Sequence, residues 1–100
     1  MKTNRAIKAL EKESALNHIL LEAATSVGEK IGHWLIIAHK DELSDRESDA
    51  TERADRLAQK FIASLKTALP GKTDIHNRAL EHMDSVAQKW VTAWKCDNAR

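Results

Sequence analysis

The chain has 100 residues, which suits one domain with a single hydrophobic core. Apolar residues make up 42% of it and charged residues 31%, while glycine (three residues) and proline (one) are scarce, a composition typical of helical proteins rather than of sheets. The net charge is +1, and positive and negative residues are interleaved along the chain. This excludes the strong overall electrostatic field that many proteins use to bind nucleic acids or membrane surfaces.

A long amphipathic helix is predicted over about residues 4–40. Apolar residues recur there at steps of three and four, the spacing of one helix face: Leu16, Leu20, Ala23, Val27, Ile31, Trp34, Leu35 and Ala38. Gly28 and Gly32 lie one turn apart inside it, and each costs up to ~1 kcal/mol of helix stability relative to alanine. Two interpretations stand: a bend that splits the segment into two helices, or a close contact with a second helix backbone or a tryptophan ring.

Two further helices are predicted over about 44–69 and 74–97. Ser44 and Glu47 have the spacing of a capping box that begins the second helix, and Pro70-Gly71 ends it. The apolar stripes are Ala50, Ala54, Leu57, Ala58, Phe61, Leu65, Ala68 and Leu69 in the second helix and Ala79, Met83, Val86, Ala87, Trp90 and Trp94 in the third. With no repeat, low-complexity tract or long linker, residues 1–100 are expected to form one domain.

The predicted fold is therefore an all-α antiparallel bundle of three helices, or of four if the first helix breaks at Gly28–Gly32. Short connections between successive helices favour antiparallel neighbours. This arrangement would bring Trp34, Trp90 and Trp94 to one end of the bundle, where their rings pack on the alanines of the second helix. A ring edge left exposed there would serve as an aromatic anchor for a partner.

The first predicted helix is longer than the other two. At ~1.5 Å rise per residue, its first ten or so residues would project roughly 15 Å beyond the bundle. This overhang carries two apolar residues and a basic face that could contact phosphate: Ile7 and Leu10, with Arg5, Lys8 and Lys12. The apolar pair predicts self-association or partner binding, and the cations would set orientation and association rate.

An acidic patch follows the first helix. Residues 41–56 hold seven acids and three arginines, and the patch comprises Asp41, Glu42, Asp45, Asp49 and Glu52. The simpler interpretation is that acids at a helix start complement the helix macrodipole. The alternative interpretation is a surface that binds a basic partner or mimics the charge of a nucleic acid.

No catalytic or metal-binding set is found in the sequence. His33/His39 and His76/His82 are each six residues apart, about 240° around a helix, so neither pair converges on one ion. The single Cys96 cannot form an intrachain disulfide. It lies beside Lys95 and Asp97 in the last predicted turn, and the sequence does not indicate the positioned base and walled pocket that a catalytic thiol needs. Enzymatic activity, a cofactor and a small-molecule substrate are therefore not expected.

The expected function is that of a non-enzymatic helical interaction protein, a homodimer that binds and masks or recruits a protein partner. A cytoplasmic location is expected because the longest apolar run, residues 34–38, is far too short for a membrane span. In size and lack of motif the chain is similar in kind to small accessory and inhibitor proteins of phages and mobile elements, such as those that block host defence. The alternatives are a nucleic-acid-binding regulator that uses the basic N-terminal arm and a small metal-binding helical protein.

Overall fold

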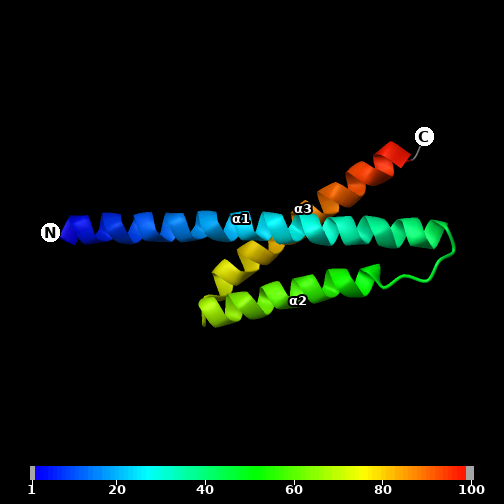
Figure 1. The fold of residues 1–100 in the computed structure, drawn as a ribbon. Helices are drawn as coiled ribbons and strands as arrows, with labels where there is room; N and C mark the ends of the chain where they lie inside the picture. The colour runs from blue at the N-terminus through cyan, green and yellow to red at the C-terminus, as the bar shows by residue number, and fades with distance from the viewer. Residues whose placement is uncertain (1, 99–100) are drawn as a thin grey trace.

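In the computed structural model, residues 2–98 form three helices and no strand: α1 (Lys2–Leu43), α2 (Ala50–Ala68) and α3 (Thr73–Asn98). The structure describes the backbone of residues 2–98 and the side chains of residues 17–97. Figure 1 shows α2 returning below α1 in the opposite direction, while α3 crosses α1 obliquely. An all-α helical bundle is confirmed, whereas an antiparallel arrangement of all three helices is not.

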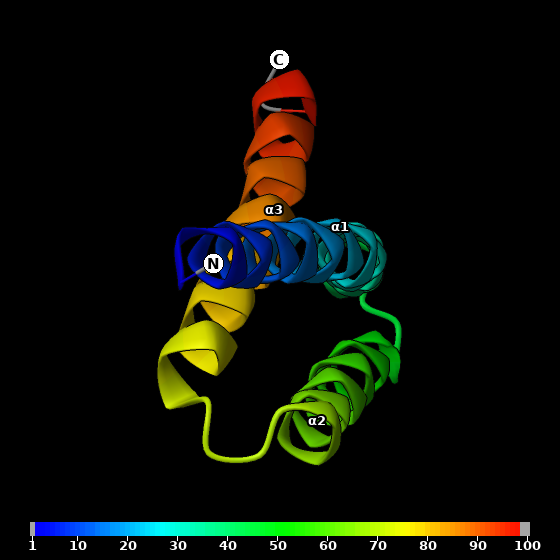
Figure 2. The same ribbon diagram turned by 90° about the vertical axis from the view of Figure 1, so that its left-hand side faces the viewer.

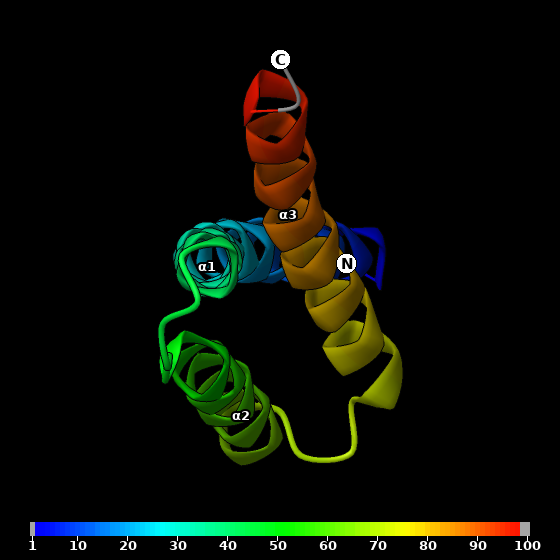
Figure 3. The same cartoon turned by 90° about the vertical axis from the view of Figure 1, so that its right-hand side faces the viewer.

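The long helix α1 is the element on which the other two are built. Both α2 and α3 pack on α1 and hardly on each other. The end-on views in Figures 2 and 3 show α2 lying along one side of α1, while α3 crosses it and diverges from α2. At about 1.5 Å per residue, the 42 residues of α1 account for nearly all of the 65 Å long dimension of the molecule. The N-terminal part of α1 projects beyond α2 and α3, in line with the predicted overhang (Figure 1).

Gly28 and Gly32 bring the backbones of α1 and α3 close together. A β-carbon added at Gly28 would lie 2.5 Å from the carbonyl oxygen of Met83. One added at Gly32 would lie 2.8 Å from Cβ of Trp90 and 3.1 Å from the carbonyl oxygen of Ala87. Only glycine leaves room for α3 at these distances, since it has no side chain to clash. The close-contact interpretation is therefore correct, and α1 is continuous where a break was the alternative.

The oblique course of α3 follows from rows of mostly small residues on the two facing helices. The rows step by four residues: Ala24, Gly28 and Gly32 on α1, and Ala79, Met83 and Ala87 on α3. When rows of this spacing on two helices interdigitate, the axes cross at about 50°, whereas packing in most antiparallel bundles gives about 20°. The crossing thus replaces the nearly parallel alignment that short connections alone would favour.

The core lies where α2 and α3 meet α1. Phe61 and Leu65 of α2, Ile31 of α1 and Met83 of α3 are buried there. These residues belong to the apolar stripes that the sequence predicts. The stripes on α1 and α3 continue into half-buried positions, because each of these helices has one side that no other helix covers.

The end of α1 is a Schellman motif, a helix stop that satisfies the last carbonyl groups. The N–H of Arg46 donates to the carbonyl of Asp41 at 2.8 Å, and the N–H of Asp45 donates to that of Glu42 at 3.1 Å. Asp45 has a positive φ of 55°, a left-handed position that usually holds glycine and that aspartate tolerates. Residues 44–46 therefore close α1.

The predicted capping box at Ser44 and Glu47 is consequently wrong. The helix α2 begins at Ala50 rather than at residue 44, with Asp49 at its N-cap and no capping hydrogen bond from the Asp49 side chain. Instead, the N–H of Ala50 donates to Oγ of Ser48 at 3.2 Å. The residues of the supposed box belong to the connection between α1 and α2.

Replacing Gly28 with alanine is expected to destabilise the fold, although alanine is the better helix former. The added methyl group would meet the carbonyl oxygen of Met83. Such overpacking costs about 1–3 kcal/mol, against a gain of up to ~1 kcal/mol from helix propensity. Urea unfolding followed by circular dichroism measures the difference.

Ser26→Ala is the matched control, because Ser26 is exposed on the same helix and its replacement should leave stability unchanged or slightly raised. An unfolding midpoint for Gly28→Ala at or above that of the natural protein would contradict the close contact.

Candidate functional site

An open groove lies between α2 and α3, with α1 as its floor. A cavity of about 250 Å³ is lined by residues of all three helices: Ile31, Leu35, Thr51, Ala54, Asp55, Ala58, Met83, Asp84 and Ala87. Most of the lining is apolar. Asp55 comes from α2 and Asp84 from α3, so each of the two diverging helices supplies one carboxylate.

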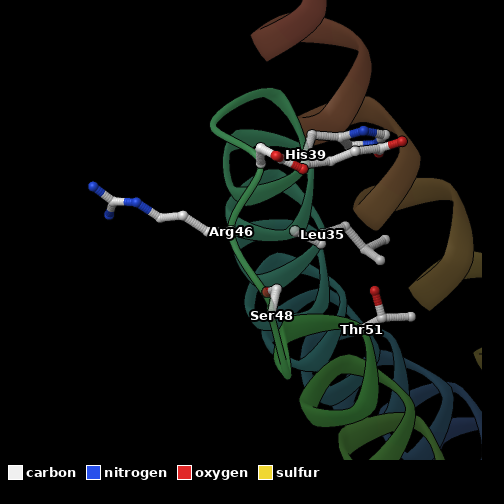
Figure 4. A pocket seen from close by; sticks show the side chains of 8 residues that line it. Leu35, His39, Arg46, Ser48 and Thr51 are labelled. Atoms are coloured by element: carbon white, nitrogen blue, oxygen red, sulfur yellow. The ribbon is translucent and has the colours of Figure 1, made fainter.

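A second cavity extends the first toward the end of α1. It measures about 470 Å³, and its lining includes Leu35 and Thr51, which also line the first cavity. Its other lining residues are Ala38, His39, Glu42, Asp45, Arg46 and Ser48. Figure 4 shows Leu35 and Thr51 extending to one side, while the side chain of Arg46 extends away from them. The two cavities adjoin at Leu35 and Thr51, and together we call them the acidic groove.

The charge of the acidic groove is strongly one-sided. Four carboxylates line it, namely Glu42, Asp45, Asp55 and Asp84, against the single cation Arg46. The ion pairs recorded among the described side chains are His18–Glu22 and Asp49–Arg53, and neither includes a groove carboxylate. Unpaired carboxylates along an apolar floor create a local negative potential that attracts cationic groups.

The structure brings only two residues of the predicted acidic patch into the groove, Glu42 and Asp45. Asp49 pairs with Arg53 at 3.0 Å, and both side chains are more than half exposed. Asp41 and Glu52 are absent from the groove lining. The patch therefore spans the end of α1, the connection and the first turn of α2, rather than the start of a single helix.

Two further groove carboxylates were missed by sequence reasoning. Asp55 lies within the acidic stretch but outside the residues chosen for the patch. Asp84 lies on another helix, and no local pattern marks it. Only the packing of α2 and α3 on α1 places these two residues on the same groove.

The three tryptophans do not form the single layer that the sequence predicts. The guanidinium carbon of Arg53 lies 5.0 Å from the ring centre of Trp34, a cation–π contact between α2 and α1. The ring of Trp94 instead stacks on His39, with centres 6.0 Å apart and planes 19° apart. Trp90 is 47% exposed, which makes it the most accessible aromatic anchor of the three.

The predicted self-association residues lie in the projecting part of α1 (Figure 1). The side chains of Arg5, Ile7, Lys8, Leu10 and Lys12 lie outside the described residues. Among the described side chains near the base of the overhang, Ile19 (60%) and Leu21 (41%) are exposed. A shallow cavity of about 200 Å³ lies beside them, lined by Leu21 and by residues at the start of α3. Exposed apolar surface is therefore present at the base of the overhang.

Two histidines connect α3 to the other helices. Nε2 of His76 lies 2.7 Å from the carbonyl of Leu69, and a carbonyl can only accept, so this nitrogen donates. Nε2 of His82 lies 2.8 Å from the hydroxyl of Thr25, which itself donates to the carbonyl of Leu21. The hydrogen bond between His82 and Thr25 joins α3 to α1.

The metal-binding alternative gains no support from side chains 17–97. Within that range, no group of three or more His, Cys, Asp or Glu residues is arranged to hold a metal ion. Cys96 is exposed near the end of α3.

No known protein family matches this chain, and neither a curated protein nor a solved structure matches it. Within the described residues, none of the helices combines the length and the apolar character needed to cross a membrane. The function therefore has to be inferred from the acidic groove and the overhang of α1.

Replacing Thr25 with valine is expected to destabilise the protein by about 1 kcal/mol, because Nε2 of His82 would lose its hydrogen-bond partner. Thr25→Ser is the matched control, since it keeps the hydroxyl and should retain most of the stability. Urea unfolding of both variants measures the difference. Equal stability of the two variants would contradict a structural role for this hydrogen bond.

Proposed function

We propose that this protein is a non-enzymatic interaction protein that holds a protein partner in the acidic groove and thereby masks or recruits it. The observation that carries the proposal is the groove itself, an apolar floor on α1 between two helices that diverge from each other. Apolar contact area bordered by charged groups is typical of protein-binding surfaces.

The side chains of the groove suit binding better than catalysis. Nucleophilic catalysis needs a hydroxyl in hydrogen-bond contact with a base. Among the described side chains, neither Ser48 nor Thr51 makes a recorded hydrogen bond with His39, whose ring stacks on Trp94. The proposal is therefore a stoichiometric binding protein of the cytoplasm. Its role would be that of an accessory or inhibitor protein of the kind that phages and mobile elements carry, for example against host defence.

Self-association through α1 is part of the proposal. Because α1 is continuous, positions 7, 10, 21, 24 and 28 follow one helix face by steps that fit the helical repeat. The helix α3 covers this face at Ala24 and Gly28, whereas Leu21 remains 41% exposed. A second copy of α1 can pack on the part of this face that α3 leaves uncovered.

The double variant Ile7→Glu with Leu10→Glu is expected to convert a homodimer into a folded monomer, because charged side chains would replace the apolar contact. Sedimentation at micromolar concentration measures the mass, and circular dichroism checks the fold. Ser26→Glu with Lys30→Glu, at two exposed positions of α1, is the control that should stay dimeric. A monomeric natural protein would contradict self-association.

Partner binding is tested by blocking the groove. Thr51 is exposed and lines both cavities, so Thr51→Trp fills their junction without disturbing buried side chains. Thr67→Trp is the matched control, since Thr67 is exposed on the same helix and absent from the groove lining. Both proteins and the natural chain are used to capture partners from the native host for mass spectrometry.

The expected result is a stoichiometric partner that the natural chain and Thr67→Trp retain and that Thr51→Trp loses. Absence of any stoichiometric partner, or equal retention by Thr51→Trp, would overturn the proposed function.

A further inference from the structure

The chemistry of the groove also specifies the kind of partner, an inference that rests on the proposed function. We infer that the acidic groove binds an amphipathic helical segment of another protein. This segment has aliphatic side chains along one face and Lys or Arg side chains on both flanks of that face.

The dimensions of the groove set the length of the segment. Its floor follows α1 from Ile31 to Glu42, which spans about 16 Å at 1.5 Å per residue. About three turns of helix cover that distance. A segment of this size is typical of the helix-in-groove mode, in which anchors at steps of three and four residues enter an apolar groove.

The floor of the groove suits aliphatic anchors. Ile31 and Leu35 form its base, and Met83 adds a flexible side chain that adapts to the shape of an incoming group. The small side chains of Ala54 and Ala58 leave space on the α2 side. Ile31 and Met83 are already largely buried. Aliphatic anchors would therefore cover mainly the exposed parts of Leu35 and Ala58, and the flanking charges share in the affinity.

The carboxylates beside the floor favour an entering helix with cationic side chains on both flanks. Asp55 on α2 and Asp84 on α3 lie on the two helices that border the floor, and Glu42 and Asp45 lie at its far end. Lys or Arg on each flank of the entering helix would therefore meet opposite charge along the groove. The same carboxylates repel phosphate groups, so nucleic acid is disfavoured at this site.

A second copy of this chain fits the groove less well than another protein does. If Ile7 and Leu10 of a second copy entered the groove, the helical repeat would place Glu11 and Glu13 on the two flanks of that apolar face. Acidic side chains would then face the carboxylates of the groove. The overhang of a second copy therefore does not bind in the acidic groove, which remains accessible to a basic partner.

The test uses two labelled synthetic peptides of about four turns. One has leucines on one face with lysines on both flanks, and in the other glutamates replace the lysines. Fluorescence anisotropy with the natural full-length chain, at low and at raised salt, measures binding. The lysine peptide is expected to bind more weakly as salt increases, and the glutamate peptide is not expected to bind.

Two charge-reversal variants distinguish the effect of the groove carboxylates on peptide binding from the effect of the protein's net charge. Asp55→Lys with Asp84→Lys should weaken binding of the lysine peptide by about tenfold or more, because cations would replace both carboxylates beside the floor. Glu52→Lys with Glu81→Lys makes the same change in net charge at exposed positions of α2 and α3 that do not line the groove. This control should keep the affinity nearly unchanged.

Three outcomes would overturn the inference. The lysine peptide does not bind, both double variants lose affinity for it equally, or duplex DNA measured in the same way binds more tightly than the lysine peptide. Each leaves the capture experiment with Thr51→Trp to decide the proposed function. A partner that this variant loses, combined with no binding of the lysine peptide, would mean that the groove binds a partner of different chemistry.

Discussion

The architecture depends on the contact between α1 and α3 at Gly28 and Gly32. Because no side chain separates the two backbones there, the carbonyl oxygen of Met83 lies within 2.5 Å of where a β-carbon of Gly28 would be. Rows of residues at steps of four then impose a steep crossing. The helix α2 has no glycine at its contact, where Phe61 and Leu65 are buried together with Ala50 and Ala54, and it runs along α1 instead. The divergence of α2 and α3 follows from this difference.

The groove is consequently a product of helix packing rather than of a flexible loop. Its floor and sides belong to helices, and the positive φ of Asp45 fixes the short connection that closes one end. Since α2 and α3 hardly touch, the position of α3 depends on the glycine contact and on the hydrogen bonds of His76 and His82. A site held in this way presents a preformed surface, which lowers the entropic cost of binding.

The length of α1 separates the two proposed surfaces along one continuous helix. The acidic groove follows its C-terminal half, from Ile31 to Glu42, while the overhang that we propose for self-association is at its N-terminus. A dimer formed through the overhang would leave both grooves accessible. Two copies of a basic helix could then be bound at once, and linked sites of this kind raise the apparent affinity for a partner with two such segments.

The sequence alone determined the helices, their apolar stripes and the unusual length of α1, because these depend on residue spacing and composition within one segment. It also marked Gly28 and Gly32 but left a bend and a close contact equally open. The start of α2 was mispredicted because aspartate, rather than glycine, occupies the left-handed position that ends α1. Tertiary structure decided which tryptophan meets which partner and that Asp84 shares a groove with Asp55. Those outcomes depend on the crossing angle between helices, which arises only when two distant rows of small residues pack together.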